Sequence, residues 1–209
     1  MTFADRRDAG QVVAAELAGY AGRADVIVLG LVRGGVPVAA EIARRLDVPL
    51  DVLVVRKLGV PWSPEVAFGA VGPHGVRVVN ADVAGKLTPA EIAAVMRHES
   101  AELVRRERRY RSGKPELDLS DRVAILVDDG LATGATARAA VAVARRLGAA
   151  EVVLAAPVGS AGALAALRRL ADAVVCPLEP ADFRAVSTYY ADFAEVRDAE
   201  VIALLRAQG

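Results

Sequence analysis

The sequence predicts an α/β protein with a doubly wound, mostly parallel sheet of about five strands, helices on both faces and a small C-terminal hood. Short runs of Val, Ile and Leu alternate with longer segments of helical periodicity, which is typical of strand-helix units in a parallel sheet. The chain has 209 residues, of which 54% are hydrophobic and only 4% aromatic. This composition favours a core of small aliphatic side chains.

The expected elements of the first half follow in order. They are an amphipathic helix at 3–20, a buried strand at 26–32, a helix at 36–46, a strand at 50–55, a mobile loop at 58–72 and a short strand at 77–80. Thr88-Pro89-Ala90-Glu91 is a capping box with Pro at the first helical position, and it begins a helix that ends near Tyr110.

The second half continues the alternation. It predicts strands at 124–127, 151–158 and 173–177 and helices at 135–147, 160–170 and 198–207. We expect one domain over 1–209, with its core at about 21–176 and the hood at about 177–197. The hood contains four aromatic residues, which either stack on a ligand or pack a small core of their own: Phe183, Tyr189, Tyr190 and Phe193.

The run from Ala124 to Thr136 carries the strongest functional signal. A buried strand leads into two carboxylates and then into a Thr-Gly-Ala-Thr turn that opens a helix. The unpaired N–H groups of a helix N-terminus favour phosphate, and two Thr hydroxyls can donate further hydrogen bonds. Carboxylates repel phosphate, so Asp128 and Asp129 are better suited to accept hydrogen bonds from vicinal hydroxyls. The run therefore predicts a site for a phosphorylated sugar.

This run resembles the phosphoribosyl pyrophosphate (PRPP) signature of type I phosphoribosyltransferases. The resemblance implies that Asp128 and Asp129 hold the ribose 2′- and 3′-hydroxyls, and that they contact a Mg²⁺ cofactor only indirectly. It assigns the other PRPP-binding positions of the run to Gly130, Ala132, Thr133, Gly134, Ala135 and Thr136. The alternative is that Asp-Asp-Gly merely turns the chain.

A second segment, Arg33-Gly34-Gly35, follows the strand at 26–32. Glycines allow backbone N–H groups to approach an anion, and an arginine suits phosphate oxygens. The segment resembles the pyrophosphate loop of the same family, although taken alone it reads as an ordinary strand-to-helix turn.

A third segment, Arg56-Lys57, resembles the basic pair of the family's catalytic loop, which reaches the departing pyrophosphate. The alternative is a solvated strand end. The family members that act on 6-oxopurines carry an Asp where this chain has Ala132. Glu65 is therefore the only carboxylate that the sequence nominates as a general base.

The resemblance implies Mg²⁺-dependent transfer of a 5-phosphoribosyl group from PRPP to a nitrogen acceptor, with release of pyrophosphate. It also favours a homodimer. The alternative function is a PRPP-sensing regulator with little or no turnover, which would give the arginine-rich segment 105–111 a partner to contact. A solvated helix end that complements the helix dipole explains that segment as well.

Composition excludes several other classes. With 26 basic and 26 acidic residues the chain has no global field for nucleic acid. Its longest uncharged run, 152–167, is shorter than the roughly 20 residues that a bilayer requires, so no membrane association is expected. One cysteine excludes an internal disulfide, and the N-terminus does not resemble a secretory signal. A cytoplasmic location is therefore predicted.

Overall fold

The structure, a computed structural model, describes residues 2–208 without the side chains of Pro64 and Glu65. Its main sheet is five-stranded and parallel, in the order β2-β1-β6-β7-β8. The strands are β1 (Val26–Leu31), β2 (Leu50–Leu53), β6 (Val123–Val127), β7 (Glu151–Ala155) and β8 (Ala173–Val175). The predicted fold class is confirmed.

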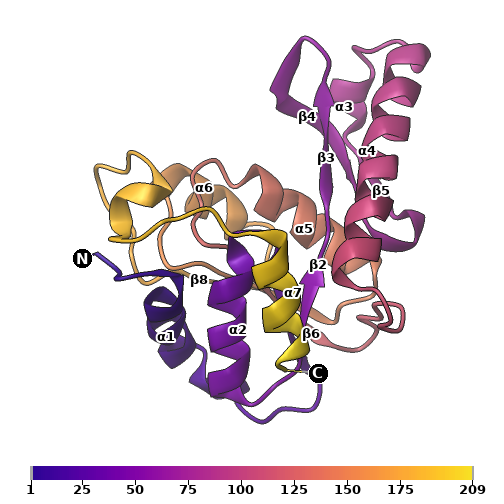
Figure 1. Ribbon diagram of the computed structural model, residues 1–209. Helices are drawn as coiled ribbons and strands as arrows, with labels where there is room; N and C mark the ends of the chain where they lie inside the picture. The colour runs from indigo at the N-terminus through magenta and orange to yellow at the C-terminus, as the bar shows by residue number, and fades with distance from the viewer. Residues whose placement is uncertain (1, 209) are drawn as a thin grey trace.

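Helices cover both faces of this sheet. On one face lie α1 (Arg6–Glu16), α2 (Gly35–Leu46) and α7 (Asp198–Arg206), which stand together in Figure 1, and on the other lie α5 (Ala135–Arg146) and α6 (Ala161–Leu167). Successive side chains of a strand point to opposite faces. In β1, accordingly, Val28 packs into the core that contains Ile42 of α2, whereas Leu29 packs into the core that contains Val143 of α5.

The strand order places two loops next to each other. The chain runs from β1 outward to the edge strand β2, and it later returns to β6 on the opposite side of β1. The loops after β1 and β6 therefore leave neighbouring strands in opposite directions across the sheet. In open α/β sheets, ligands bind at such a switch point. We call these loops, residues 32–35 and 128–136, the rim.

A second, antiparallel sheet projects from the body (Figure 1). It consists of β3 (Arg56–Val60), β4 (Ser63–Val71) and β5 (Arg77–Val79), followed by α3 (Ala81–Ala84) and α4 (Pro89–Tyr110). We call residues 56–110 the arm. At the N-terminus of α4, the predicted capping box is confirmed: the Glu91 amide donates to Thr88 Oγ1 at 3.3 Å, and the Thr88 amide donates to Glu91 Oε2 at 2.8 Å.

The expected mobile loop at 58–72 was wrong, because these residues form the β3–β4 hairpin. The Gly and Pro residues that suggested a loop are accommodated by register shifts around Gly59. Leu58, Val60 and Phe68 are buried in the core cluster that also receives Leu103 of α4. Tertiary burial therefore decided the conformation, and Arg56 and Lys57 begin a strand instead of ending one.

The tail, residues 177–197, is irregular apart from a short 3-10 helix, η3 (Val186–Tyr189), and it lies beside the N-terminal segment (Figure 1). The Phe3 amide donates to the Tyr189 carbonyl and the Ala191 amide donates to the Phe3 carbonyl, both at 2.8 Å. The four tail aromatics contact one another or Phe3, with ring centroids 4.9 to 5.8 Å apart. They form a small core of their own, which was one of the two alternatives.

The end of α4 is fixed to the edge of the main sheet by a buried ion pair. Arg111 Nη2 lies 3.1 Å from Asp51 Oδ2, with side-chain exposures of 9% and 11%, and Lys114 Nζ lies 3.6 Å from Asp51 Oδ1. Removing one partner of such a pair leaves an uncompensated buried charge, which is strongly destabilising.

We therefore expect Asp51→Asn to lower the free energy of unfolding by about 3 kcal/mol, measured by urea denaturation. Asp25→Asn is the matched control, because Asp25 pairs with Arg23 at 2.7 Å but both side chains are more than 40% exposed. The control should leave stability almost unchanged. Equal losses in the two variants would contradict the role assigned to Asp51.

Candidate functional site at the sheet rim

The two loops of the rim are in direct contact, and glycines make the contact possible. A Cβ atom at Gly34 would lie 2.2 Å from Asp129 Oδ2, and one at Gly35 would lie 2.2 Å from the Val127 carbonyl oxygen. A side chain at either position would displace part of the other loop. The loop that begins with Arg33 therefore packs against the acidic pair, and two segments separated by about ninety residues of sequence form one surface.

Asp129 is held from several directions. Its Oδ2 accepts a hydrogen bond from Arg6 Nε at 2.9 Å, and its backbone carbonyl accepts one from the Tyr190 hydroxyl at 2.6 Å. Its amide donates to Asp128 Oδ1 at 3.0 Å. Arg6 was not among the site residues predicted from sequence, because nothing in the N-terminal helix marks one arginine as different from its neighbour.

The acidic pair is electrostatically strained. Burial, with a further contribution from the Asp129 charge, raises the pKa of Asp128 to about 8. Burial also raises the pKa of Asp129, but the Arg6 guanidinium opposes that shift. Before a ligand binds, Asp128 is thus the carboxyl that more readily carries a proton at neutral pH, and Asp129 is the one stabilised as an anion.

The remainder of the acidic loop leads into the N-terminus of α5. Gly134 adopts a φ of 68° immediately before the helix, a conformation that favours glycine, and the flanking Ala132, Thr133 and Thr136 are exposed. Gly130 lies against Val186 of the tail.

Ser160 anchors this loop, since its hydroxyl donates to the Ala132 carbonyl at 2.7 Å. The Ser160 amide also donates to the Leu131 carbonyl at 2.9 Å. The loop is therefore anchored on α6, and the first N–H group of α5, that of Ala135, donates to Thr133 Oγ1 at 3.4 Å.

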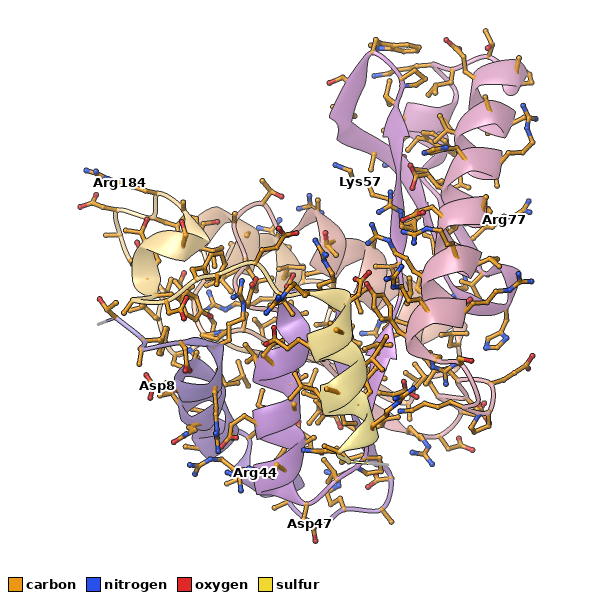
Figure 2. The ribbon with its side chains drawn as sticks, in the orientation of Figure 1. Asp8, Arg44, Asp47, Lys57, Arg77 and Arg184 are labelled. Atoms are coloured by element: carbon orange, nitrogen blue, oxygen red, sulfur yellow. The ribbon has the colours of Figure 1, made fainter. Side chains whose placement is uncertain are left out.

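The basic pair at the start of β3 faces the rim across a cavity of about 720 Å³. Arg56, Lys57 and Thr136 all line it, together with Val32 and Glu99. Arg56 Nε lies 2.7 Å from Glu99 Oε2 of α4. Lys57 projects from the arm above α5 (Figure 2). The arm thus brings two cations to the side of the rim where α5 begins.

A second cavity, of about 550 Å³, lies on the other side of the Arg33 loop, where Arg33, Gly34 and Asp129 meet Arg6 and Phe193. The Arg33 guanidinium pairs with Glu195 of the tail and lies 3.7 Å from Asp198 of α7. Asp129 and Arg33 line this second cavity and the neighbouring Val32 lines the first, so the rim borders both cavities.

Glu65, the nominated base, belongs to β4, and its side chain lies outside the described part of the structure. Among the residues described, no three His, Cys, Asp or Glu side chains are grouped so that they could hold a metal ion. Asp128 and Asp129 still offer hard oxygen ligands of the kind that Mg²⁺ prefers, provided that a bound phosphate or water supplies the others.

Arginines at the C-terminal end of α4 form ion pairs within the protein. Arg105 and Arg106 each lie 2.7 Å from Glu102, and Arg109 Nε lies 2.8 Å from Asp198. With Arg111 on Asp51, this pairing supports the interpretation as a structural helix end and gives no support to a nucleic-acid site. No helix within residues 2–208 has both the length and the apolarity needed to cross a bilayer.

Comparison with known proteins agrees with this geometry. The phosphoribosyl transferase domain family matches residues 7–193. In two strains of Mycobacterium tuberculosis, CDC 1551 and H37Rv, proteins named "Putative phosphoribosyl transferase" MT0597 and Rv0571c are 53% identical over 205 residues. The match covers 97% of this chain but 46% of each relative, so the chain spans about half of their length.

A solved structure is similar over the whole chain. The crystal structure of TT1426 from Thermus thermophilus has 43% sequence identity and a TM-score of 0.91, and the match covers 100% of this chain and 99% of that one.

The raised pKa of Asp128 predicts a pH-dependent stability. Between the ordinary carboxyl value of about 3.9 and about 8, the unfolded chain has lost this proton while the native state retains it, so stability falls as pH rises. Asp128→Asn removes this titrating group. As pH rises through this range, the free energy of unfolding of the variant should increase relative to that of the parent by at most about 1.4 kcal/mol per pH unit.

The measurement is the thermal midpoint without ligand at pH 5, 6.5 and 8, with Asp25→Asn as the surface control. Parallel profiles for the parent and Asp128→Asn would contradict the assignment.

Proposed function

This chain belongs to the phosphoribosyl transferase domain family, and on that premise we propose that it transfers the 5-phosphoribosyl group of PRPP to a nitrogen acceptor and releases pyrophosphate. The observation that carries the proposal is the contact between the Gly34-Gly35 loop and the acidic pair at the switch point of the sheet. It puts groups suited to a diol, a phosphate and a pyrophosphate on one continuous surface.

The sugar phosphate lies along the acidic loop in this proposal. Asp128 and Asp129 accept hydrogen bonds from the ribose 2′- and 3′-hydroxyls. The 5′-phosphate is bound by the hydroxyls of Thr133 and Thr136 and by N–H groups at the start of α5. The exposure of both threonines supports this orientation, and so does the N-cap of α5, which is a glycine without a capping side chain. Thr133 Oγ1 accepts a long hydrogen bond, 3.4 Å, from the Ala135 amide.

The reaction breaks the bond between ribose C1 and the pyrophosphate oxygen and forms a bond from C1 to the acceptor nitrogen, which loses a proton. Negative charge grows on pyrophosphate as it leaves, and preorganised cations stabilise that charge. Arg33 approaches from one cavity, and Arg56 and Lys57 approach from the other. Without ligand, Arg56 pairs with Glu99 and Arg33 with Glu195, so pyrophosphate would compete with these carboxylates.

Mg²⁺ is part of this proposal. When bound, it would neutralise part of the pyrophosphate charge. Asp128 and Asp129 fit an ion that takes most of its ligands from substrate and water, as Mg²⁺ commonly does at phosphate sites. The general base remains Glu65 as a prediction, as do the homodimer and the cytoplasmic location.

The direct test incubates purified protein with PRPP, Mg²⁺ and a panel of purines, pyrimidines and small amines, and measures pyrophosphate. We expect acceptor-dependent release. Asp129→Asn should weaken PRPP binding by about tenfold or more, the equivalent of a lost charge-assisted hydrogen bond. Arg56→Met should mainly lower kcat, because Arg56 meets the charge that grows in the transition state.

Arg23→Met, in an exposed pair away from the rim, is the control and should retain full activity. No PRPP binding by the parent protein would overturn the proposal. PRPP binding without turnover on any acceptor would favour the alternative, a PRPP-sensing regulator.

Gly34→Ala tests the loop contact directly. Gly34 has ordinary right-handed backbone angles, and the three atoms nearest to an added methyl group all belong to the Asp129 carboxylate. We expect the variant to fold and to lose PRPP affinity, measured by isothermal titration calorimetry. Gly19→Ala is the matched control, since a Cβ there has nothing within 4 Å. Unchanged affinity in Gly34→Ala would show that the contact is not required.

A further inference from the structure

Arg6, the first residue of α1, makes an unusual number of contacts for a residue near a chain end. Its side chain is only 11% exposed. Its Nε donates to Asp129 Oδ2 at 2.9 Å and its Nη1 donates to the Ala194 carbonyl at 2.8 Å. The guanidinium carbon also lies 3.9 Å from the centroid of the Phe193 ring, within the range of a cation–π contact.

The helix that carries Arg6 is itself held in place. The Asp5 side chain caps α1 by accepting from the Asp8 amide at 2.8 Å. The preceding residues pair with the tail, where the Asp192 amide donates to the Ala4 carbonyl at 2.9 Å. Because Arg6 joins both parts, the N-terminal segment and the tail act as one unit that presents a guanidinium to Asp129.

The stacking of Arg6 changes the role of Phe193. The ring face that could have received a planar acceptor is covered by the guanidinium. Phe193 therefore orients Arg6, and both residues line the adjoining cavity. This agrees with the packing of the other tail aromatics against one another and Phe3.

The family match begins at residue 7, so Arg6 lies just outside the part of the chain that the family defines. A role for Arg6 consequently cannot be carried over from the family's motifs. It rests on the contacts of this chain alone.

We propose that Arg6 is a positioning residue for sugar binding: by holding Asp129 Oδ2, it orients Asp129 so that its second oxygen, Oδ1, receives the ribose hydroxyls. The proposal rests on the proposed function. It extends the PRPP site to the N-terminal helix. Arg6 acts through Asp129, whereas Arg33, Arg56 and Lys57 are the residues proposed to meet pyrophosphate.

The test compares Arg6→Met and Arg6→Lys with the parent protein. Arg6→Met should weaken PRPP binding and raise its KM by about tenfold, while kcat changes little. Binding of pyrophosphate alone, measured by calorimetry, should be unchanged, because pyrophosphate does not use Asp129. Arg6→Lys should recover part of the PRPP affinity, since an ammonium can pair with Asp129 but cannot also reproduce the planar contact with Phe193.

Arg7→Met is the matched control from the same helical turn, because Arg7 is 72% exposed and lies 3.6 Å from Glu41, away from the rim. It should behave like the parent. If Arg6→Met loses PRPP and pyrophosphate binding together, or retains both, the positioning role is overturned.

A thermal double-mutant cycle of Arg6→Met and Asp129→Asn separates this inference from the proposed function, because it needs no ligand. Shifts in thermal midpoint that are clearly non-additive support an interaction between Arg6 and Asp129. Additive shifts overturn it, even if the parent protein binds PRPP as proposed. If the parent protein does not bind PRPP, the proposed function is wrong. The double-mutant cycle still tests whether Arg6 and Asp129 interact.

Discussion

The contact between the loop after β1 and the loop after β6 is the constraint on which the rest of the site depends. It exists because the strand order puts β6 beside β1 and because Gly34 and Gly35 have no side chains to keep the loops apart. A parallel sheet delivers the carboxyl ends of neighbouring strands to one edge, and the glycines convert that proximity into a shared surface. The acidic pair, both cavities and the cations of the arm are arranged around this contact.

The same contact has an electrostatic cost. Two adjacent carboxyls lie partly buried at the proposed ligand site, and this loss of solvent raises the pKa of each. Arg6 opposes this rise at Asp129 through a hydrogen bond and its charge but at Asp128 through its charge alone, so Asp128 is the carboxyl that more readily carries the proton. Binding sites often lower the stability of a fold, because the polar groups that a ligand contacts lack that partner in the unbound protein. In this protein the cost is confined to one dipeptide, and the arginine that reduces it lies 123 residues earlier in the sequence.

The arm supplies the other half of the charge. Arg56 and Lys57 begin the strand that connects the body to the antiparallel sheet, so their position depends on how the arm is attached. Asp51 with Arg111, and Asp198 with Arg109 and Tyr110, tie the far end of α4 to the body. Glu99 of the same helix then pairs with Arg56. Arg56 is therefore held by an ion pair to a helix that ion pairs fix to the body, and the arginine-rich segment 105–111 contributes to that attachment.

The sequence by itself determined the order of the elements, the parallel sheet and the acidic loop, because those features are written in local periodicity and in short motifs such as Asp128-Asp129 and Thr88-x-x-Glu91. It was wrong about 58–72, where Gly and Pro suggested a loop but burial of Leu58 and Phe68 against α4 produced a hairpin. It also missed Arg6 and Ser160, whose partners lie 123 and 28 residues away. Only the tertiary structure decided those contacts, because a long-range ion pair or hydrogen bond leaves no periodicity in the segments that it joins.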